Sequence, residues 1–228
     1  MNPCALDLTQ NSRTRLLESA IFCFSEKGFD ATGIREIAQL AQANSALVQY
    51  HFGGKDGLYR AALSFIFERT ASGLAEQPLA RPDAPEARAK AIQGLRTLLQ
   101  NLIQELTSCT KGTALDQAAL LLVTREMQAP HSQAVPLVME HIRPYIEHLS
   151  ACLRVLRPDL DERRLLDMHM SIYGPIFHLH SNMALTRLVR GDPDFPRDPE
   201  DIQKLVDHFT DFSLRGLGIP EAFPNQGV

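Results

Sequence analysis

The chain has 228 residues, of which 44% are hydrophobic and 22% charged, a balance typical of a globular protein that buries a core. Its formal net charge of −4 argues against a protein that coats nucleic acid without regard to sequence, but not against specific DNA binding. The longest apolar run, 118–123, is far shorter than the roughly 20 residues that span a bilayer, and the N-terminus lacks a secretory signal pattern, so a cytoplasmic protein without membrane contact is expected.

The first part of the chain predicts two helices joined by a short connection. Apolar residues recur at helical spacing over 12–27, and Gly28 is expected to end this helix in a left-handed conformation. A second helix of about two turns is expected over 33–41, with Thr32 as its N-cap.

A third helix is expected from Asn44, which can cap it, to Phe52, before Gly53 and Gly54 break the chain. Two short helices separated by a turn of three or four residues form a helix-turn-helix, whose second helix enters the major groove of DNA. The pattern leaves four residues pointing outward from this helix: Ser45, Ala46, Gln49 and Tyr50. A small helical bundle without a nucleic-acid role would show a similar pattern, so that alternative stays open.

Residues 14–62 resemble the DNA-binding domain of the TetR family of bacterial transcriptional regulators. The resemblance rests on Phe-Ser-Glu-Lys-Gly-Phe at the end of the first helix, Ile-Arg-Glu-Ile-Ala in the second, and Tyr-His-Phe at 50–52 followed by Lys55 and Leu58. Gln42 stands where the family usually has Gly, and a left-handed Gln would be strained by about 1 kcal/mol. Gln49 stands where the family often has a Tyr that contacts phosphate.

The resemblance implies roles for ten residues at the DNA surface. Tyr50, His51 and Lys55 would hold the DNA backbone, with Thr32 near a phosphate. The residues expected to face the bases are Arg35, Asn44, Ser45, Ala46, Leu47 and Gln49. Arg suits guanine, while Asn and Gln suit adenine. Two structural alternatives remain: Arg35 could pair with a neighbouring acid, and His51 could make a hydrogen bond between helices.

The rest of the chain predicts further helices and no strands, so the fold class is all-α. A connecting helix is expected over 55–77, followed by a loop with three prolines. Later helices are expected over 86–109, 113–128, 136–157, 161–190 with an interruption at Gly174-Pro175, and 200–217. The predicted organisation is a helix-turn-helix domain (10–54), the connecting helix (55–77), a ligand-binding and dimerisation domain (86–218) and a tail (219–228).

The C-terminal domain is expected to form a homodimer. Its last two long helices carry more apolar residues than one buried face requires, and in the family resembled such a helix pair forms a four-helix dimer bundle. The expected interface comprises Ile172, Ile176, Leu179, Met183, Leu188, Leu205, Phe209 and Phe212. A twofold dimer would present two recognition helices about 34–36 Å apart, which suits a palindromic operator.

The same domain is expected to hold a small-molecule effector. Ligand pockets in helical bundles are mostly apolar with a few polar groups. The candidate residues are Leu99, Ile103, Leu122, Met127, Tyr145, Met170, Tyr173, Phe177 and His178. Most of these residues would look the same in an empty core, so that alternative stays open too.

No metal, cofactor or enzymatic activity is expected. The four cysteines are widely scattered without zinc-finger spacing, and the histidines around 141–148 and 178–180 are badly spaced to chelate one ion. Motifs of hydrolases, metalloproteases and phosphate-binding loops are absent from the sequence.

Three segments are also similar to the CerR (CecR)-like branch of the family, whose members are drug- or stress-responsive repressors. These segments are 43–63, EHIRPYIEHL at 140–149 and IYGPIFHLHSN at 172–182. The sequence therefore predicts a ligand-responsive repressor. The alternative is a DNA-bound structural or cell-division factor of the same fold without an inducer.

Overall fold

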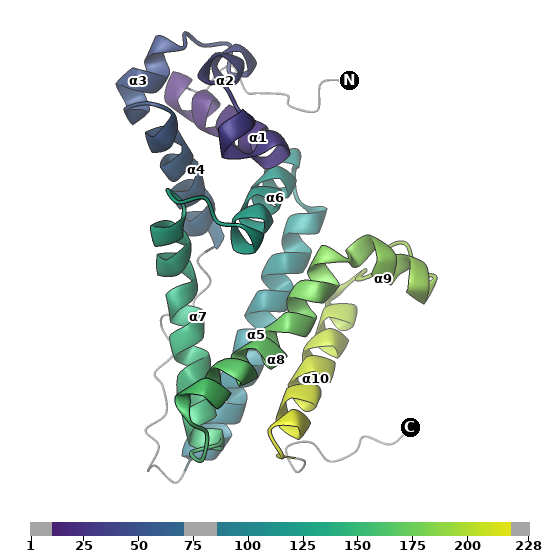
Figure 1. The fold of residues 1–228 in the computed structure, drawn as a ribbon. Coiled ribbons are helices and arrows are strands. Elements are labelled where there is room, and N and C mark those ends of the chain that lie inside the picture. Colours follow the sequence, from purple (N-terminus) through teal and green to yellow (C-terminus); the bar gives the residue numbers. More distant parts are fainter. Residues whose placement is uncertain (1–10, 71–85, 220–228) are drawn as a thin grey trace. The chain divides into compact units, whose positions relative to one another are not determined.

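The computed structural model describes residues 11–70 and 86–219, except for the side chains of residues 70, 106 and 108–111. These residues form ten α-helices and no strand, which confirms the predicted all-α class (Figure 1). The helices are α1 Ser12–Ala31, α2 Ile34–Leu40, α3 Ala46–Phe52, α4 Lys55–Thr70, α5 Ala87–Lys111, α6 Ala114–Gln128, α7 Val135–Leu156, α8 Glu162–Ser181, α9 Met183–Arg190 and α10 Pro199–Gly216. The expected extension of the connecting helix to 77, the proline loop and the tail from 220 lie outside the described residues.

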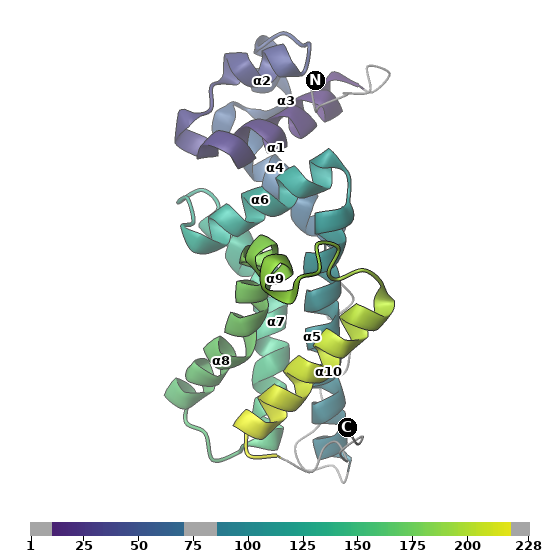
Figure 2. The ribbon, with the colours of Figure 1, turned by 90° about the vertical axis from the view of Figure 1, so that its right-hand side faces the viewer.

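The described residues divide into two compact units. The first contains 11–70 and 108–142, and the second contains 86–107 and 143–219. In the first unit, α1 packs against α2, α4 and α6, and α3 packs against α4 and α1 (Figures 1 and 2). Its core is made of fully buried apolar side chains that include Leu16, Ile21, Phe24, Ile37, Val48, Leu58, Tyr59, Leu63 and Leu122. This core fixes α3 on the helices around it.

The end of α1 differs from the prediction. Gly28 has the expected positive φ of 78°, but its ψ is 175° and helical structure resumes as far as Ala31. Thr32 does not cap the next helix, whose N-cap is Gly33. Instead, the Thr32 hydroxyl lies 2.7 Å from the Gly28 carbonyl oxygen and 3.1 Å from that of Cys23. The last carbonyls of a helix lack backbone donors, so a buried hydroxyl beside them supplies one.

The second unit contains most of α5, the larger part of α7 and the helices from α8 onward, and its core again consists of apolar side chains. Buried members include Leu95, Leu98, Leu99, Ile103, Leu149, Leu153, Leu165, Ile172, Ile176, Val206 and Leu214. Among the helices that the structure describes, none is both long and apolar enough to cross a membrane.

The expected interruption at Gly174-Pro175 is wrong. Helix α8 continues through Pro175 and ends at Ser181, and the break before α9 is at Asn182. The Asn182 side-chain amide donates to the His178 carbonyl at 3.1 Å and so satisfies an acceptor at the end of α8. A proline removes one helical hydrogen bond, and the packing of Tyr173 and Ile176 in the core holds the helix together around it.

Candidate nucleic-acid interface

Helix α3 has one buried side and one open side. Val48 is fully buried, whereas Asn44, Ser45, Ala46, Gln49 and Tyr50 are exposed, and Tyr50 reaches 80% exposure. The four residues expected to point outward from α3 do so.

The ends of α3 are fixed by local structure. The Asn44 side-chain oxygen accepts a hydrogen bond from the backbone N–H of Ala46 at 2.8 Å, but the N-cap of α3 is Ser45, so the predicted cap at Asn44 is wrong by one residue. At the other end, Gly53 has a φ of 71° and its N–H donates to the Gln49 carbonyl. These two contacts define the length of the open face.

The turn between α2 and α3 contains a strained residue. Gln42 has a φ of 49°, the left-handed conformation that was expected if the turn keeps its family geometry. The turn is held by hydrogen bonds from the Gln42 N–H to the Gln39 carbonyl and from the Ala43 N–H to the Ala38 carbonyl.

Arg35 lies exposed on α2. Within the described part of the chain its side chain has no hydrogen bond or ion pair, because the neighbouring acid, Glu36, pairs with Lys27. The guanidinium group is therefore free for a partner outside the chain.

Three of the four residues expected to hold phosphates already have polar partners in the protein. Lys55 donates to the Asp30 carbonyl at 3.3 Å, and its ammonium lies 4.4 Å from the centre of the Phe29 ring. His51 Nε2 lies 3.2 Å from the Ser12 hydroxyl, which is the hydrogen bond between helices considered as an alternative. Thr32 is only 2% exposed.

Two residues at the start of α1 lie beside this face and were not predicted. Besides Ser12, the exposed Arg13 places its guanidinium 5.3 Å from the centre of the Phe52 ring. Helical periodicity shows that Arg13 lies off the apolar stripe, but it gives no information on which helix lies next to it.

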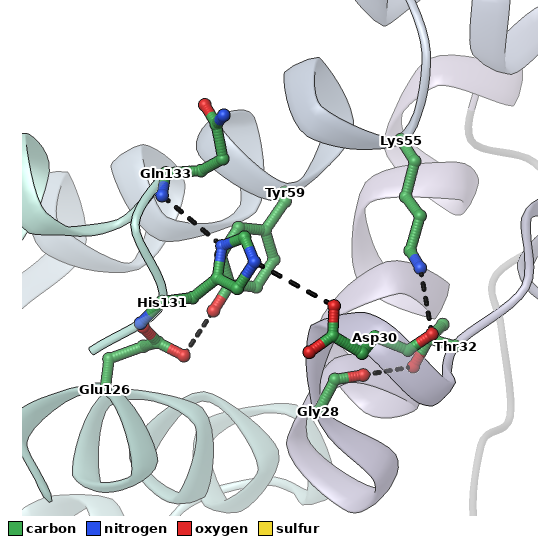
Figure 3. A network of polar contacts seen from close by, with 8 residues as sticks. All are labelled: Gly28, Asp30, Thr32, Lys55, Tyr59, Glu126, His131 and Gln133. Atoms are coloured by element: carbon green, nitrogen blue, oxygen red, sulfur yellow. Dashed lines mark hydrogen bonds and ion pairs between the residues drawn. The ribbon is translucent and has the colours of Figure 1, made fainter. Parts of the chain in front are cut away.

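A second group of polar contacts in the first unit was also not predicted. It contains Glu126 of α6, Tyr59 of α4 and His131 of the following turn (Figure 3). The sequence offered no signal for it, because a Glu near the end of a helix normally faces solvent.

The expected ligand-pocket residues fall into both units. Leu122 and the partly exposed Met127 belong to the first unit, and Leu122 is part of its core. In the second unit, Leu99 and Ile103 are buried, and the Tyr173 hydroxyl donates to the Tyr145 carbonyl at 2.9 Å. The other three residues, Met170, Phe177 and His178, are exposed on α8.

The second unit also contains a small pocket of about 10 Å³. Its lining comprises Ile103, Thr107, Ile176, Leu179, His180 and Met183. Space of this size holds about one water molecule, so a larger ligand would have to displace side chains.

The expected dimer residues differ in exposure. Ile172 and Ile176 are buried in the chain's own core, whereas Leu188 and Phe212 are 77% and 55% exposed. Other large apolar side chains on α8 and α9 are exposed as well: Leu166, Leu185 and Val189. The second unit therefore has an open apolar surface that differs in part from the predicted one.

Two family models match the chain. Residues 16–62 match bacterial regulatory proteins of the tetR family, and residues 95–217 match the C-terminal domain of the HTH-type transcriptional dual regulator CecR. The CecR protein of Shigella flexneri is 25% identical, over 95% of this chain and 97% of that protein.

Two other relatives match only in part. A probable regulator, YttP of Bacillus subtilis, is 40% identical over 25% of this chain, and BetI of Burkholderia thailandensis is 29% identical over 38%. The matched regions span 28% and 45% of those two proteins.

Solved structures share the fold. A TetR-like transcriptional regulator from Rhodococcus sp. RHA1 has a TM-score of 0.58 at 18% identity, covering 91% of this chain and 96% of that one. A TetR transcriptional regulator from Agrobacterium tumefaciens has a TM-score of 0.57 at 18% identity, covering 90% and 92%.

Proposed function

The chain belongs to the TetR family of bacterial regulatory proteins and has a C-terminal domain of the CecR type, and from this premise we propose that it is a homodimeric transcriptional repressor. It binds a palindromic operator in double-stranded DNA through α3. A small molecule bound in the C-terminal domain releases it, to the extent that this molecule binds the DNA-incompetent state more tightly.

The observation that carries the proposal is the open face of α3. Five consecutive or near-consecutive residues from Asn44 to Tyr50 are exposed while Val48 anchors the helix in the core. Arg35 adds a free guanidinium, and the partly exposed Lys55 adds a positive charge. These groups have the chemistry of base-edge and phosphate recognition.

The open apolar surface of the second unit supports the dimer. Surfaces of this kind on α8 to α10 are unfavourable in water unless a partner covers them. A second copy of the chain supplies a matching surface, because a twofold interface joins the same patch of both subunits. We include the exposed Leu188 and Phe212 in this interface.

The effector site is proposed within the second unit, around Leu99, Ile103, Tyr145 and Tyr173 and the small pocket beside His180. These residues combine an apolar lining with a few polar groups. The proposed ligand is larger than the present pocket, so its binding requires side chains to move, which is the property expected of an effector that changes conformation.

The proposal is tested by selecting duplexes from a random DNA library with the wild-type protein. We expect enrichment of a palindrome whose binding weakens steeply with salt. Arg35→Ala should weaken the selected duplex more than random DNA, whereas Lys55→Ala should weaken both alike. Failure to enrich any sequence over random duplex would refute specific DNA binding, and equal losses for the two variants would refute base contact by Arg35.

A further inference from the structure

Glu126 is a buried acidic side chain that the proposed DNA contacts do not use. It lies near the end of α6 and is 3% exposed. Its Oε1 accepts a hydrogen bond from the Tyr59 hydroxyl of α4, and its Oε2 accepts one from the His131 backbone N–H at 2.8 Å (Figure 3). The carboxylate therefore joins α4 to the turn between α6 and α7. We call this arrangement of Tyr59, Glu126 and the His131 N–H the brace.

Tyr59 connects the brace to the helix-turn-helix. Its ring is fully buried, and its centre lies 4.8 Å from the centres of both Phe24 and Phe29. Burial and the bond to Glu126 raise the pKa of the Tyr59 hydroxyl, so it stays protonated and donates. Tyr59 also lies one helical turn after Lys55, which begins α4 directly behind the recognition helix. The brace is therefore attached to the first two turns of α4.

Further contacts join the same elements. The His131 ring lies 4.2 Å from the Phe29 ring, and its Nε2 lies 4.0 Å from a carboxylate oxygen of Asp30. Arg125 donates to the Glu26 carbonyl at 3.3 Å. The end of α6 and the following turn therefore contact both α1 and α4. Among the contacts described between these elements, the one to α4 is made by a buried carboxylate, that of Glu126.

We propose that Glu126 is a positioning residue for operator recognition. Its carboxylate holds the start of α4, and with it the position of α3, against the turn that follows α6. This inference rests on the proposed function, since a palindrome requires recognition helices at a fixed spacing, whereas random DNA is bound mainly through its phosphates. The brace therefore matters for the specific complex and not for the non-specific one.

The test compares binding of two probes: the duplex selected by the wild type and a random duplex of equal length. Dissociation constants are measured by fluorescence anisotropy at a low temperature where circular dichroism shows every variant folded. Tyr59→Phe and Glu126→Ala should weaken the selected duplex by about tenfold, within the range typical of coupling between sites, and leave the random duplex unchanged.

A conservative variant and a matched control separate positioning from stability. Glu126→Gln should retain affinity, because its carbonyl can accept from the His131 N–H while its amide donates to the Tyr59 oxygen. Ser150→Ala is the control. It removes a hydroxyl that lies 3.0 Å from Nε2 of the buried His169 in the second unit, so it loses a comparable contact away from the brace and should leave both duplexes unaffected.

The outcomes are distinguishable. If the wild type selects no duplex, the proposed function fails, and the positioning role fails with it. If a duplex is selected, three results overturn the positioning role alone. In the first, the two brace variants bind that duplex like the wild type; in the second, they lose affinity for both duplexes equally; in the third, they lose no more affinity than Ser150→Ala does.

Discussion

Replacing Gln42 by Gly should stabilise the protein. Gln42 has a φ of 49°, and a left-handed residue with a Cβ atom costs roughly 1–2 kcal/mol that Gly does not incur. Gly also makes the unfolded chain more flexible, which offsets about 0.4–1 kcal/mol. The Gln42 side chain is exposed, so its loss removes little packing. The net expectation is a gain of about 0.5–1 kcal/mol in the free energy of unfolding, from the difference of these two effects.

Urea and thermal denaturation measure this gain. For a chain of this size the midpoint temperature should rise by about 1–4 °C. Gln42→Ala is the control, because Ala keeps the Cβ atom and the backbone strain and should give no such gain. A Gly variant no more stable than the wild type would refute the strain argument. Equal gains for Gly and Ala would show that the side chain, rather than the backbone, causes the effect.

Three further predictions concern capping, pH and base recognition. Thr32→Val should lower the free energy of unfolding by about 1–3 kcal/mol in urea titrations, because buried carbonyls at the end of α1 lose their donor. Burial lowers the pKa of His141 below its ordinary value of 6.5, so the stability that the neutral ring contributes is present above pH 6.5 and is lost as the pH falls through the lowered pKa. Between pH 7 and 5, the free energy of unfolding should therefore fall less steeply for His141→Phe than for the wild type, as measured by urea denaturation. Gln49→Ala should weaken the selected duplex by about tenfold in anisotropy titrations with little effect on random DNA, whereas Asn44→Ser, which keeps a side-chain oxygen for the Ala46 N–H, should weaken it less.

The sequence predicted the helices of the first unit well, because each is defined by signals that act locally. The apolar stripe of α1 and the paired glycines at 53–54 lie within a few residues of the boundaries they set, and the predicted cap at Asn44 misses the N-cap of α3, Ser45, by one residue. The left-handed turn at Gln42 was also predictable, but only through the family resemblance, since Gln has no intrinsic preference for that conformation.

The errors came from contacts that depend on the tertiary structure. Thr32 appeared as a cap for the following helix, but the buried carbonyls of the preceding helix bind its hydroxyl. The pair Gly174-Pro175 favours a break, but core packing of Tyr173 and Ile176 keeps α8 intact there. Local propensity is a weak prior that burial overrides. Glu126 shows the same limit, because its side-chain partner Tyr59 is 67 residues away in sequence.

The geometry of α3 favours Gln49 over Asn44 as a residue that contacts bases. The Asn44 carboxamide is bound to the first residue of α3 through the Ala46 N–H, so turning it to an adenine breaks a hydrogen bond that contributes about 1 kcal/mol. Gln49 is exposed and, among the described residues, its side chain has no hydrogen bond, so both its donor and its acceptor are available for the two adenine contacts. Gln49 is also where the family often has a phosphate-contacting Tyr. We therefore propose that Gln49 reads sequence at a position where relatives often hold the backbone. In this proposal the phosphate contacts fall to Tyr50 and Lys55, whose chemistry does not distinguish bases.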